Sequence, residues 1–216
     1  MKTAIVIGAT GLVGNFITLH LLDDARYEKV KVFVRRSLKI NNPKLEEHLI
    51  NFEKIDIWKE YLTGDELYSA LGTTIKKAGS KEAQYKIDYS YQYEVAKAAA
   101  QNGVKKYLLV SSAGANYKSG NFYLRMKGKL DEAVQQLSFE QIFIFRPSIL
   151  AGYRIERRLG ESLGIKIAGT ITKIIPALKK YRPIEASKVA EAMIKSANQN
   201  ISDKIKIYRP EEIFKV

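Results

Sequence analysis

Cysteine is absent from the 216-residue chain, and histidine occurs only at His20 and His48. The lack of cysteine excludes disulfides, thiol catalysis and cysteine-ligated zinc. Two isolated imidazoles do not make a metal site, so we expect no bound metal. No apolar run reaches membrane-spanning length, and the first residues lead into an expected strand rather than a secretory signal. These absences favour a cytoplasmic protein without a membrane partner.

Acidic residues are few relative to basic ones. The chain has 36 Lys and Arg against 23 Asp and Glu, a net charge of +13, and residues 154–182 are rich in Lys and Arg. The first interpretation is a solvated basic surface, and the second is attraction for an anionic small-molecule substrate. Nucleic acid is the least favoured partner, because no aromatic side chains alternate with the basic ones. The sequence carries no clear mark of an oligomeric state.

Strand-like and helix-like segments alternate along the chain. Apolar or alternating runs predict strands at 4–7, 29–34, 48–52, 67–71, 107–111, 141–145 and 204–208. Helical patterns cover 12–23, 85–102, 121–137 and 187–198. This alternation predicts an α/β fold with a doubly wound parallel sheet, in a single domain over 1–216. Gly and Pro punctuate 150–186, which we interpret as a small C-terminal cap over the site.

The most informative motif is the run from Gly8 to Gly14, Gly-Ala-Thr-Gly-Leu-Val-Gly, which follows the first strand and opens the first helix. Gly8 permits a tight turn, Gly11 lets phosphates approach the backbone, and Gly14 lets the helix lie close to the strand. The free N–H groups at the start of the helix then face the pyrophosphate of a dinucleotide. The motif predicts a Rossmann-like NAD(P)-binding fold. The expected cofactor contacts are Gly8, Thr10, Gly11, Leu12, Val13 and Gly14.

Residues that follow the next strands predict which dinucleotide is bound. Arg35 and Arg36 come directly after the second strand, where the adenosine ribose is expected, and no carboxylate is present there. Guanidinium groups suit a 2′-phosphate, whereas an acidic residue would select NAD, so we predict NADP, with NADPH preferred over NADH. Further contacts are expected at the strand ends: Asn51 and Phe52 at the adenine, and Leu71, Gly72 and Thr73 beneath the nicotinamide ribose.

Hydroxyl and ammonium groups gather after the fifth strand. Ser111 and Ser112 end that strand, and Tyr123 and Lys127 stand four residues apart on one face of the next helix. A phenol has an ordinary pKa of about 10, and a neighbouring ammonium favours phenolate, so this pair suits proton exchange. A serine hydroxyl would hydrogen-bond a substrate carbonyl. The alternative is an exposed pair that only supports its helix, since a second Tyr-x-x-x-Lys match occurs at 93–97.

Taken together in this order, the motifs resemble those of an atypical short-chain dehydrogenase/reductase, most similar to the Tat-interacting, oxidoreductase-like branch. The matching pieces are Gly8–Gly14, Arg35-Arg36, Asn51–Lys54, Leu71–Thr74, Lys77–Gly79, Leu109–Ala115, Asn121–Leu124, Lys127-Gly128 and Phe145–Pro147. The resemblance implies a Rossmann fold, NADP(H) binding and a catalytic set of Ser112, Tyr123 and Lys127, with Ser111, Lys127 and Pro147 beside the cofactor.

Two details of the resemblance concern side chains of the site. Ser112 is chosen over Ser111 because the second serine of such a pair usually faces the cofactor in related enzymes. Many relatives also use an asparagine on the fourth helix to relay protons. Residues 88–100 hold no asparagine and offer Asp88 and Gln92 instead.

These observations favour an NADP(H)-dependent oxidoreductase of short-chain dehydrogenase type. It would transfer hydride to or from a small carbonyl or alcohol substrate, with Tyr123 as the acid/base. The alternative is an NADP(H)-binding regulator or redox sensor without turnover, which the missing asparagine keeps open. A nucleic-acid-binding protein, motivated only by the net charge of +13, is the third hypothesis.

Overall fold

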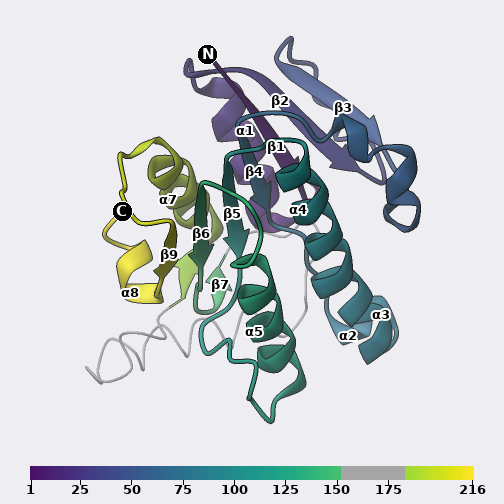
Figure 1. Ribbon diagram of the computed structural model, residues 1–216, viewed down its shortest axis with the longest axis vertical. Helices are drawn as coiled ribbons and strands as arrows, with labels where there is room; N and C mark the ends of the chain where they lie inside the picture. The colour runs from purple at the N-terminus through teal and green to yellow at the C-terminus, as the bar shows by residue number, and fades with distance from the viewer. Residues whose placement is uncertain (152–182) are drawn as a thin grey trace.

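The computed structural model describes residues 1–151 and 183–216. The main sheet contains β1 (Lys2–Ile7), β2 (Tyr27–Val34), β3 (Leu45–Leu49), β4 (Glu66–Ser69), β5 (Lys106–Val110), β6 (Gln141–Phe145) and β9 (Ile205–Tyr208). These strands are all parallel, in the order β3-β2-β1-β4-β5-β6-β9, so their carboxyl ends lie at one edge (Figure 1). The chain runs outward from β1 to β3 and then returns to β4. Ligands of open α/β sheets bind where the strand order reverses in this way.

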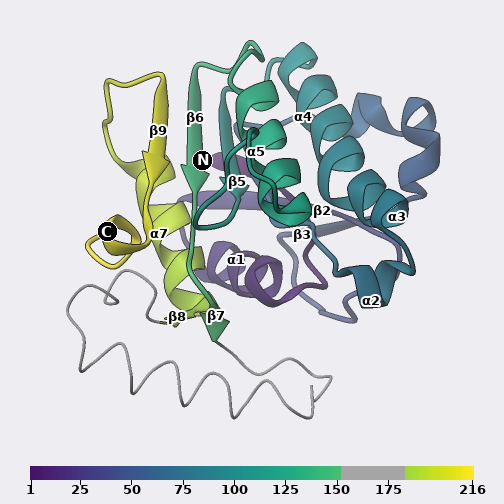
Figure 2. The ribbon, with the colours of Figure 1, turned by 90° about the horizontal axis from the view of Figure 1, so that it is seen from below.

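Helices cover both faces of the sheet. The α-helices are α1 (Leu12–Asp23), α2 (Ile75–Ala78), α3 (Lys81–Tyr85), α4 (Tyr91–Gln101), α5 (Phe122–Val134), α7 (Ala186–Asn198) and α8 (Pro210–Ile213). Shorter elements are the 3₁₀ helices η1 (Phe52–Ile57) and η2 (Lys59–Tyr61) and the π-helical segment η3 (Lys86–Ser90). Figure 2 shows α1 and α7 on one face and α4 and α5 on the other. This confirms the predicted doubly wound, Rossmann-like α/β fold.

Each face of the sheet has its own hydrophobic core. Alternate residues of one strand serve opposite cores: Ala4 and Val6 pack under α1 and α7, whereas Ile5 and Ile7 pack under α4 and α5. All four side chains are fully buried, because β1 is covered on both faces. A parallel strand buried on both faces needs a continuous apolar run, and that run was the signal that located β1 in the sequence.

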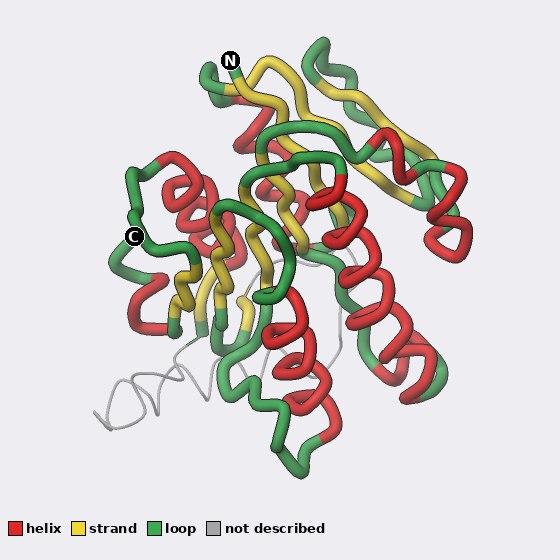
Figure 3. Tube along the Cα trace, in the orientation of Figure 1, coloured by secondary structure: helices red, strands yellow, loops and turns green. Residues whose placement is uncertain are grey.

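Several predicted boundaries were wrong. The third strand is β3 at Leu45–Leu49 rather than 48–52, because its charged edge residues hide the strand pattern and Asn51 instead caps the helix η1. β4 ends at Ser69 rather than at residue 71. The helix expected over 85–102 begins earlier, at Lys81, and contains the π-helical segment η3. Figure 3 shows the strands in yellow with the helices in red around them. The strand expected at 204–208 is β9, which lies at one edge of the sheet.

A polar network ties the amino ends of several strands together. The buried Glu66 carboxylate accepts hydrogen bonds from Lys2 Nζ at 2.7 Å, Tyr27 Oη at 2.6 Å and Tyr68 Oη at 2.7 Å. Asn198, at the end of α7, accepts from Lys2 and donates to Tyr27. The network therefore joins β1, β2, β4 and α7 at the edge of the sheet opposite to the carboxyl ends.

The predicted cap over 150–186 falls mostly outside the described residues. Its two ends are described: β7 (Leu150–Ala151) pairs in parallel with β8 (Ile184–Glu185), beside the carboxyl edge of the main sheet. The basic residues of 154–182 lie wholly outside the description. Among the helices of the described parts, none has the length and apolar character needed to cross a membrane.

Candidate active site

The glycine loop between β1 and α1 is packed too tightly for any side chain at two of its glycines. Gly8 has φ +83°, and a Cβ there would lie 2.5 Å from the Ala70 carbonyl group. A Cβ at Gly14 would lie 2.2 Å from the Gly8 carbonyl oxygen, so the first turn of α1 sits directly on the loop. The Gly11 amide donates to that same oxygen at 2.8 Å. The sequence motif therefore folds into the close strand–turn–helix contact that it predicts.

The start of α1 is open toward this loop. Gly11 is the N-cap residue, and no side chain in the described parts caps the helix. A helix without a cap leaves its first N–H groups for water or an anion. Thr10 and Gly11 are exposed and Leu12 is half-buried, whereas Val13 and Gly14 are buried. A Cβ at Gly11 would come within 3.0 Å of the Gly8 carbonyl oxygen, so glycine keeps this approach to the backbone clear.

Arg35 and Arg36 come directly after β2, the strand beside β1. Ile7 of β1 pairs with Phe33 of β2, so both arginines follow the strand end that adjoins the glycine loop. Both side chains are exposed, and neither forms an ion pair with a residue that the structure describes. Two guanidinium groups without an ion-pair partner in the described residues therefore follow the strand next to the glycine loop.

On the other side of β1, the segment after β4 is held by the elements that follow it. The Thr73 amide donates to Asp88 Oδ1 at 2.7 Å, and the Thr73 carbonyl accepts from Gln84 Nε2 at 3.3 Å. Leu71 packs at the edge of one core, and Gly72 is exposed. The predicted ribose-binding residues 71–73 therefore form a fixed loop beside the glycine loop.

The predicted catalytic side chains come from the end of β5 and from α5. Lys127 is only 4% exposed, and its Nζ donates to the Val110 carbonyl at 3.2 Å, one of three possible donations. Tyr123 lies one turn earlier on the same helix and is 37% exposed. Tyr123 and Lys127 thus stand one turn apart on α5, the first exposed and the second buried.

The two serines have different surroundings. Ser111 is buried, and its Oγ has no hydrogen-bond partner in the described parts. Ser112 is half-buried, and its Oγ makes one long hydrogen bond, 3.4 Å to the Ala113 carbonyl. The Ala113 amide donates to the Pro147 carbonyl at 2.8 Å, so Pro147 fixes the turn that carries Ser112.

Asn51 and Phe52 serve the fold in ways that the sequence did not indicate. Asn51 Oδ1 accepts from the Glu53 amide at 2.9 Å and so caps η1. The Phe52 ring is buried, stacked on Tyr91 at a centroid distance of 5.3 Å and in edge contact with Trp58. That ring face is therefore taken up by the core. The adenine contact predicted for these residues stays a prediction.

The buried carboxylate of Asp131, near Lys127, was not predicted from the sequence. Asp131, on the next turn of α5, is fully buried and accepts from Arg146 Nε at 2.9 Å. Burial raises the pKa of Asp131, while the charges of Arg146 and Lys127 act to lower it. A one-turn spacing of Lys127 and Asp131 on α5 was the available signal, but charged pairs at that spacing usually face solvent.

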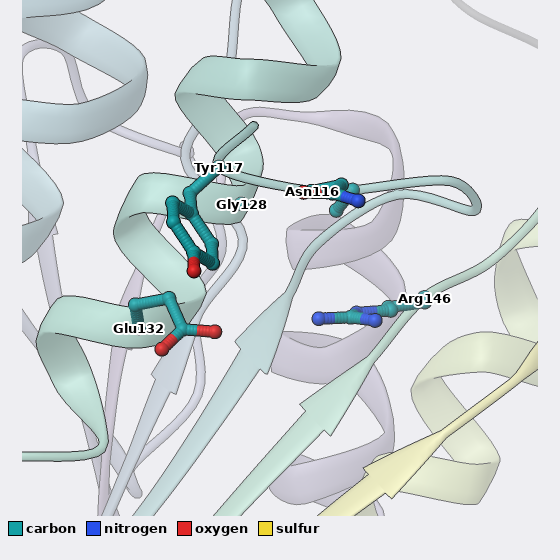
Figure 4. A pocket seen from close by; sticks show the side chains of 6 residues that line it. Asn116, Tyr117, Gly128, Glu132 and Arg146 are labelled. Carbon is teal, nitrogen blue, oxygen red and sulfur yellow. The ribbon is translucent and has the colours of Figure 1, made fainter. Parts of the chain in front are cut away.

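A cavity of about 230 Å³ lies between α5, the loop after β5 and the end of β6. Figure 4 shows the side chains of Tyr117, Glu132 and Arg146 turned toward it. Gly128 forms one wall. A Cβ there would lie 2.3 Å from the Tyr117 amide nitrogen, so the missing side chain lets the loop lie against the helix. None of the lining residues belongs to the predicted site.

The residues present fit a dinucleotide. The glycine loop leaves the backbone open, the start of α1 has free donors, and cations lie at the end of β2. Gly8, Gly11 and Gly14 with the start of α1 would hold the pyrophosphate, Arg35 and Arg36 the adenosine end, and residues 71–73 with Lys127 the nicotinamide end. No His, Cys, Asp and Glu group that would bind a metal occurs in the described parts.

Comparisons with known proteins agree with this geometry. A family model described as NAD(P)H-binding matches residues 8–158. The protein fmp52 of Emericella nidulans is 33% identical over 95% of this chain and 91% of its own length. The FMP52 protein of Candida albicans is 34% identical over 98% and 96%.

Solved structures show the same fold at low sequence identity. A short-chain dehydrogenase/reductase superfamily protein from Agrobacterium tumefaciens with bound NAD superposes with a TM-score of 0.73 at 11% identity, covering 96% of this chain and 77% of that one. A UDP-N-acetylglucosamine 4-epimerase from Methanobrevibacter ruminantium gives a TM-score of 0.70 at 16% identity, covering 96% and 76%.

The comparisons correct one prediction and establish the family. The cytoplasmic location was wrong, because relatives that are 33–34% identical over nearly the whole chain are named as mitochondrial proteins. Matched by the family model over more than half its length, the chain belongs to the NAD(P)H-binding family, with a short-chain dehydrogenase-like Rossmann fold and the fungal Fmp52 proteins among its relatives.

Proposed function

We propose that this protein is an NADP(H)-dependent oxidoreductase of the short-chain dehydrogenase type that acts on a small carbonyl or alcohol. The observation that carries the proposal is the exposed Tyr123 and the buried Lys127, one turn apart on α5, at the carboxyl edge of the sheet that also holds the glycine loop. The resemblance to the Tat-interacting, oxidoreductase-like branch stays a prediction from the motifs, and we carry no regulatory activity over from it.

NADPH held by the glycine loop and Lys127 would supply the hydride for reduction of a carbonyl carbon. The Ser112 hydroxyl hydrogen-bonds the carbonyl oxygen as negative charge develops on it. Tyr123 donates its phenolic proton to that oxygen, and the Lys127 ammonium stabilises the phenolate that remains. Because Tyr123 reaches solvent, water returns the proton. In the oxidative direction each proton transfer is reversed.

A panel assay tests the reaction. The wild-type protein is mixed with NADPH and a series of small aldehydes and ketones, including carboxylate-bearing ones that suit a basic protein, and loss of NADPH fluorescence is followed. Turnover of any member supports the proposal. Tight NADPH binding without turnover across the panel would instead favour the regulator or redox sensor.

Cofactor choice gives a separate prediction. We expect the wild type to bind NADPH more tightly than NADH, and Arg35→Ala to weaken NADPH binding by about tenfold through the loss of a charge-assisted contact to the 2′-phosphate. Titrations monitored by nucleotide fluorescence measure both affinities. The NADH affinity of the variant is the internal control and should stay unchanged, because NADH lacks that phosphate. Tighter binding of NADH by the wild type would reverse the assignment.

We also propose that the protein works in mitochondria, on the basis of the names of its relatives. Cell fractionation with an antibody against the protein tests this. Recovery in the cytosolic fraction alone would contradict it.

A further inference from the structure

The cavity of about 230 Å³ beside α5 lies on a different face of that helix from the candidate active site. Tyr123 and Glu132 are nine residues apart in the chain, which at about 100° per residue puts them on roughly opposite sides of α5. Gly128 and Glu132, one turn apart, line the cavity, whereas Tyr123 and Lys127 do not. The cavity is therefore separate from the predicted catalytic side chains.

Arg146 is anchored at the inner end of its guanidinium group. Its Nε donates to Asp131 Oδ2 at 2.9 Å, and its backbone N–H donates to the Tyr208 carbonyl at 2.9 Å. The Asp131 carboxylate is fully buried, whereas the Arg146 side chain is 25% exposed. Its terminal nitrogens, Nη1 and Nη2, donate to no residue that the structure describes. A guanidinium held in this way presents a fixed planar edge with free donors, which matches a carboxylate.

A carboxylate lies on the other side of the cavity. Figure 4 shows Glu132 and Arg146 turned toward it from two elements, α5 and the end of β6. Glu132 is exposed, and the two side chains form no ion pair within 4.0 Å. The Tyr117 hydroxyl group points toward Glu132 in the same view. A positive and a negative group thus face one space without being paired to each other.

These two charges favour a ligand that carries both signs. A simple anion on Arg146 would meet the Glu132 carboxylate, and a simple cation on Glu132 would meet the guanidinium, so each would face a repulsive neighbour. A zwitterion satisfies both groups. The volume corresponds to roughly eight waters at about 30 Å³ each, which admits a molecule of amino-acid size and is too small to enclose a nucleotide.

We propose that this cavity is a binding site for a small amino carboxylate, separate from the dinucleotide site. The terminal nitrogens of Arg146 hold its carboxylate through two parallel hydrogen bonds, and Glu132 holds its ammonium group. The Tyr117 hydroxyl oxygen accepts a further hydrogen bond from that ammonium group. None of these three residues takes part in the proposed reaction, so the inference does not depend on the oxidoreductase proposal.

Glycine, β-alanine and γ-aminobutyrate test the site, because they carry the same two charges at increasing separation. We expect at least one of them to bind with a dissociation constant on the order of 1 mM or tighter, measured by isothermal titration calorimetry. Acetate and ethylammonium carry one charge each and should bind about tenfold more weakly, since each lacks one charged hydrogen-bond partner.

Two variants test the assigned contacts. Glu132→Gln changes an exposed helix residue and should weaken binding of the zwitterion by about tenfold, while binding of acetate does not fall. Arg146→Lys keeps a positive charge beside Asp131 but loses the planar pair of donors, and should also weaken binding by about tenfold.

A control variant and a spectrum locate the binding. Glu94→Gln removes an exposed carboxylate from α4, away from the cavity, and should bind the zwitterion as the wild type does. In NMR spectra of the labelled protein, the amide signals of Tyr117 and Gly128 should shift during the titration. The signals of Gly8 and Gly11 should stay in place, and saturating NADPH should not displace the zwitterion.

The site assignment is overturned if none of the three zwitterions binds, or if acetate binds as tightly as they do. Undiminished binding by Glu132→Gln, or displacement of the zwitterion by NADPH, would also contradict it. None of these measurements involves turnover of NADPH, so the oxidoreductase proposal is tested separately.

Discussion

Replacing Tyr123 by phenylalanine is expected to lower kcat by roughly 10²–10⁴-fold, the usual contribution of a positioned general acid or base. The ring is kept and only the hydroxyl group is lost. Because the side chain is 37% exposed and makes no hydrogen bond in the described parts, the free energy of unfolding should hardly change. Steady-state kinetics with NADPH and a carbonyl found in the panel measure the effect, and NADPH affinity should remain that of the wild type.

The chain supplies a matched control for this variant. The segment 93–97 contains a second Tyr-x-x-x-Lys pair, on α4, where Tyr93 stacks against Tyr89 at a centroid distance of 6.1 Å. Tyr93→Phe makes the same chemical change on the neighbouring helix and should leave kcat unchanged. Equal rates for the Tyr123 variant and the wild type would remove Tyr123 from the mechanism.

Gly8→Ala is expected to abolish cofactor binding and to destabilise the fold by about 2–4 kcal/mol. One part of this cost comes from the backbone, since φ of +83° is unfavourable for alanine by roughly 1–2 kcal/mol. The other part comes from the Cβ, which would lie 2.5 Å from the Ala70 carbonyl group and would push the glycine loop away from the end of β4. Urea unfolding gives the free energy, and NADPH titration gives the affinity.

Gly103→Ala separates these two parts. Gly103 has the same φ of +83°, but a Cβ there would meet nothing within 4 Å. The control should therefore lose about 1–2 kcal/mol of stability, from the backbone alone, and bind NADPH normally. If the two variants lost equal stability and both still bound NADPH, the close packing at Gly8 would not be what shapes the cofactor loop.

Local backbone requirements explain what could be predicted from the sequence. Gly8 and Gly14 occur where a Cβ would meet backbone atoms, so the glycine pattern located the loop correctly. The continuous apolar run of β1 and the alternating residues of β9 located these two strands, which lie at the centre and at one edge of the sheet. β3 was misplaced because it is a partly exposed edge strand with Glu46 and Glu47 in its middle. In such a strand neither face is fully buried, so its residues need not follow an apolar or alternating pattern.

The electrostatic part of the site could not be predicted. Asp88 lies on η3, which contacts α5 only in the folded chain. Asp131 shares α5 with Lys127, but its burial and its pairing with Arg146 depend on the end of β6 packing against that helix. Which of Ser111 and Ser112 faces the site also depends on tertiary contacts that the sequence does not reveal. A sequence gives the order of such groups, but the direction of each side chain depends on tertiary contacts.

The Glu66 network has a consequence for the integrity of the molecule. It joins Lys2, near the start of the chain, to Asn198, near its end, and α7 packs directly on α1. Truncation after residue 151 would therefore remove α7 from beside α1 and leave Tyr27 without its amide partner. The elements at 183–216 are a necessary part of the folded unit rather than an appendage, and proteolytic fragments lacking them should be insoluble.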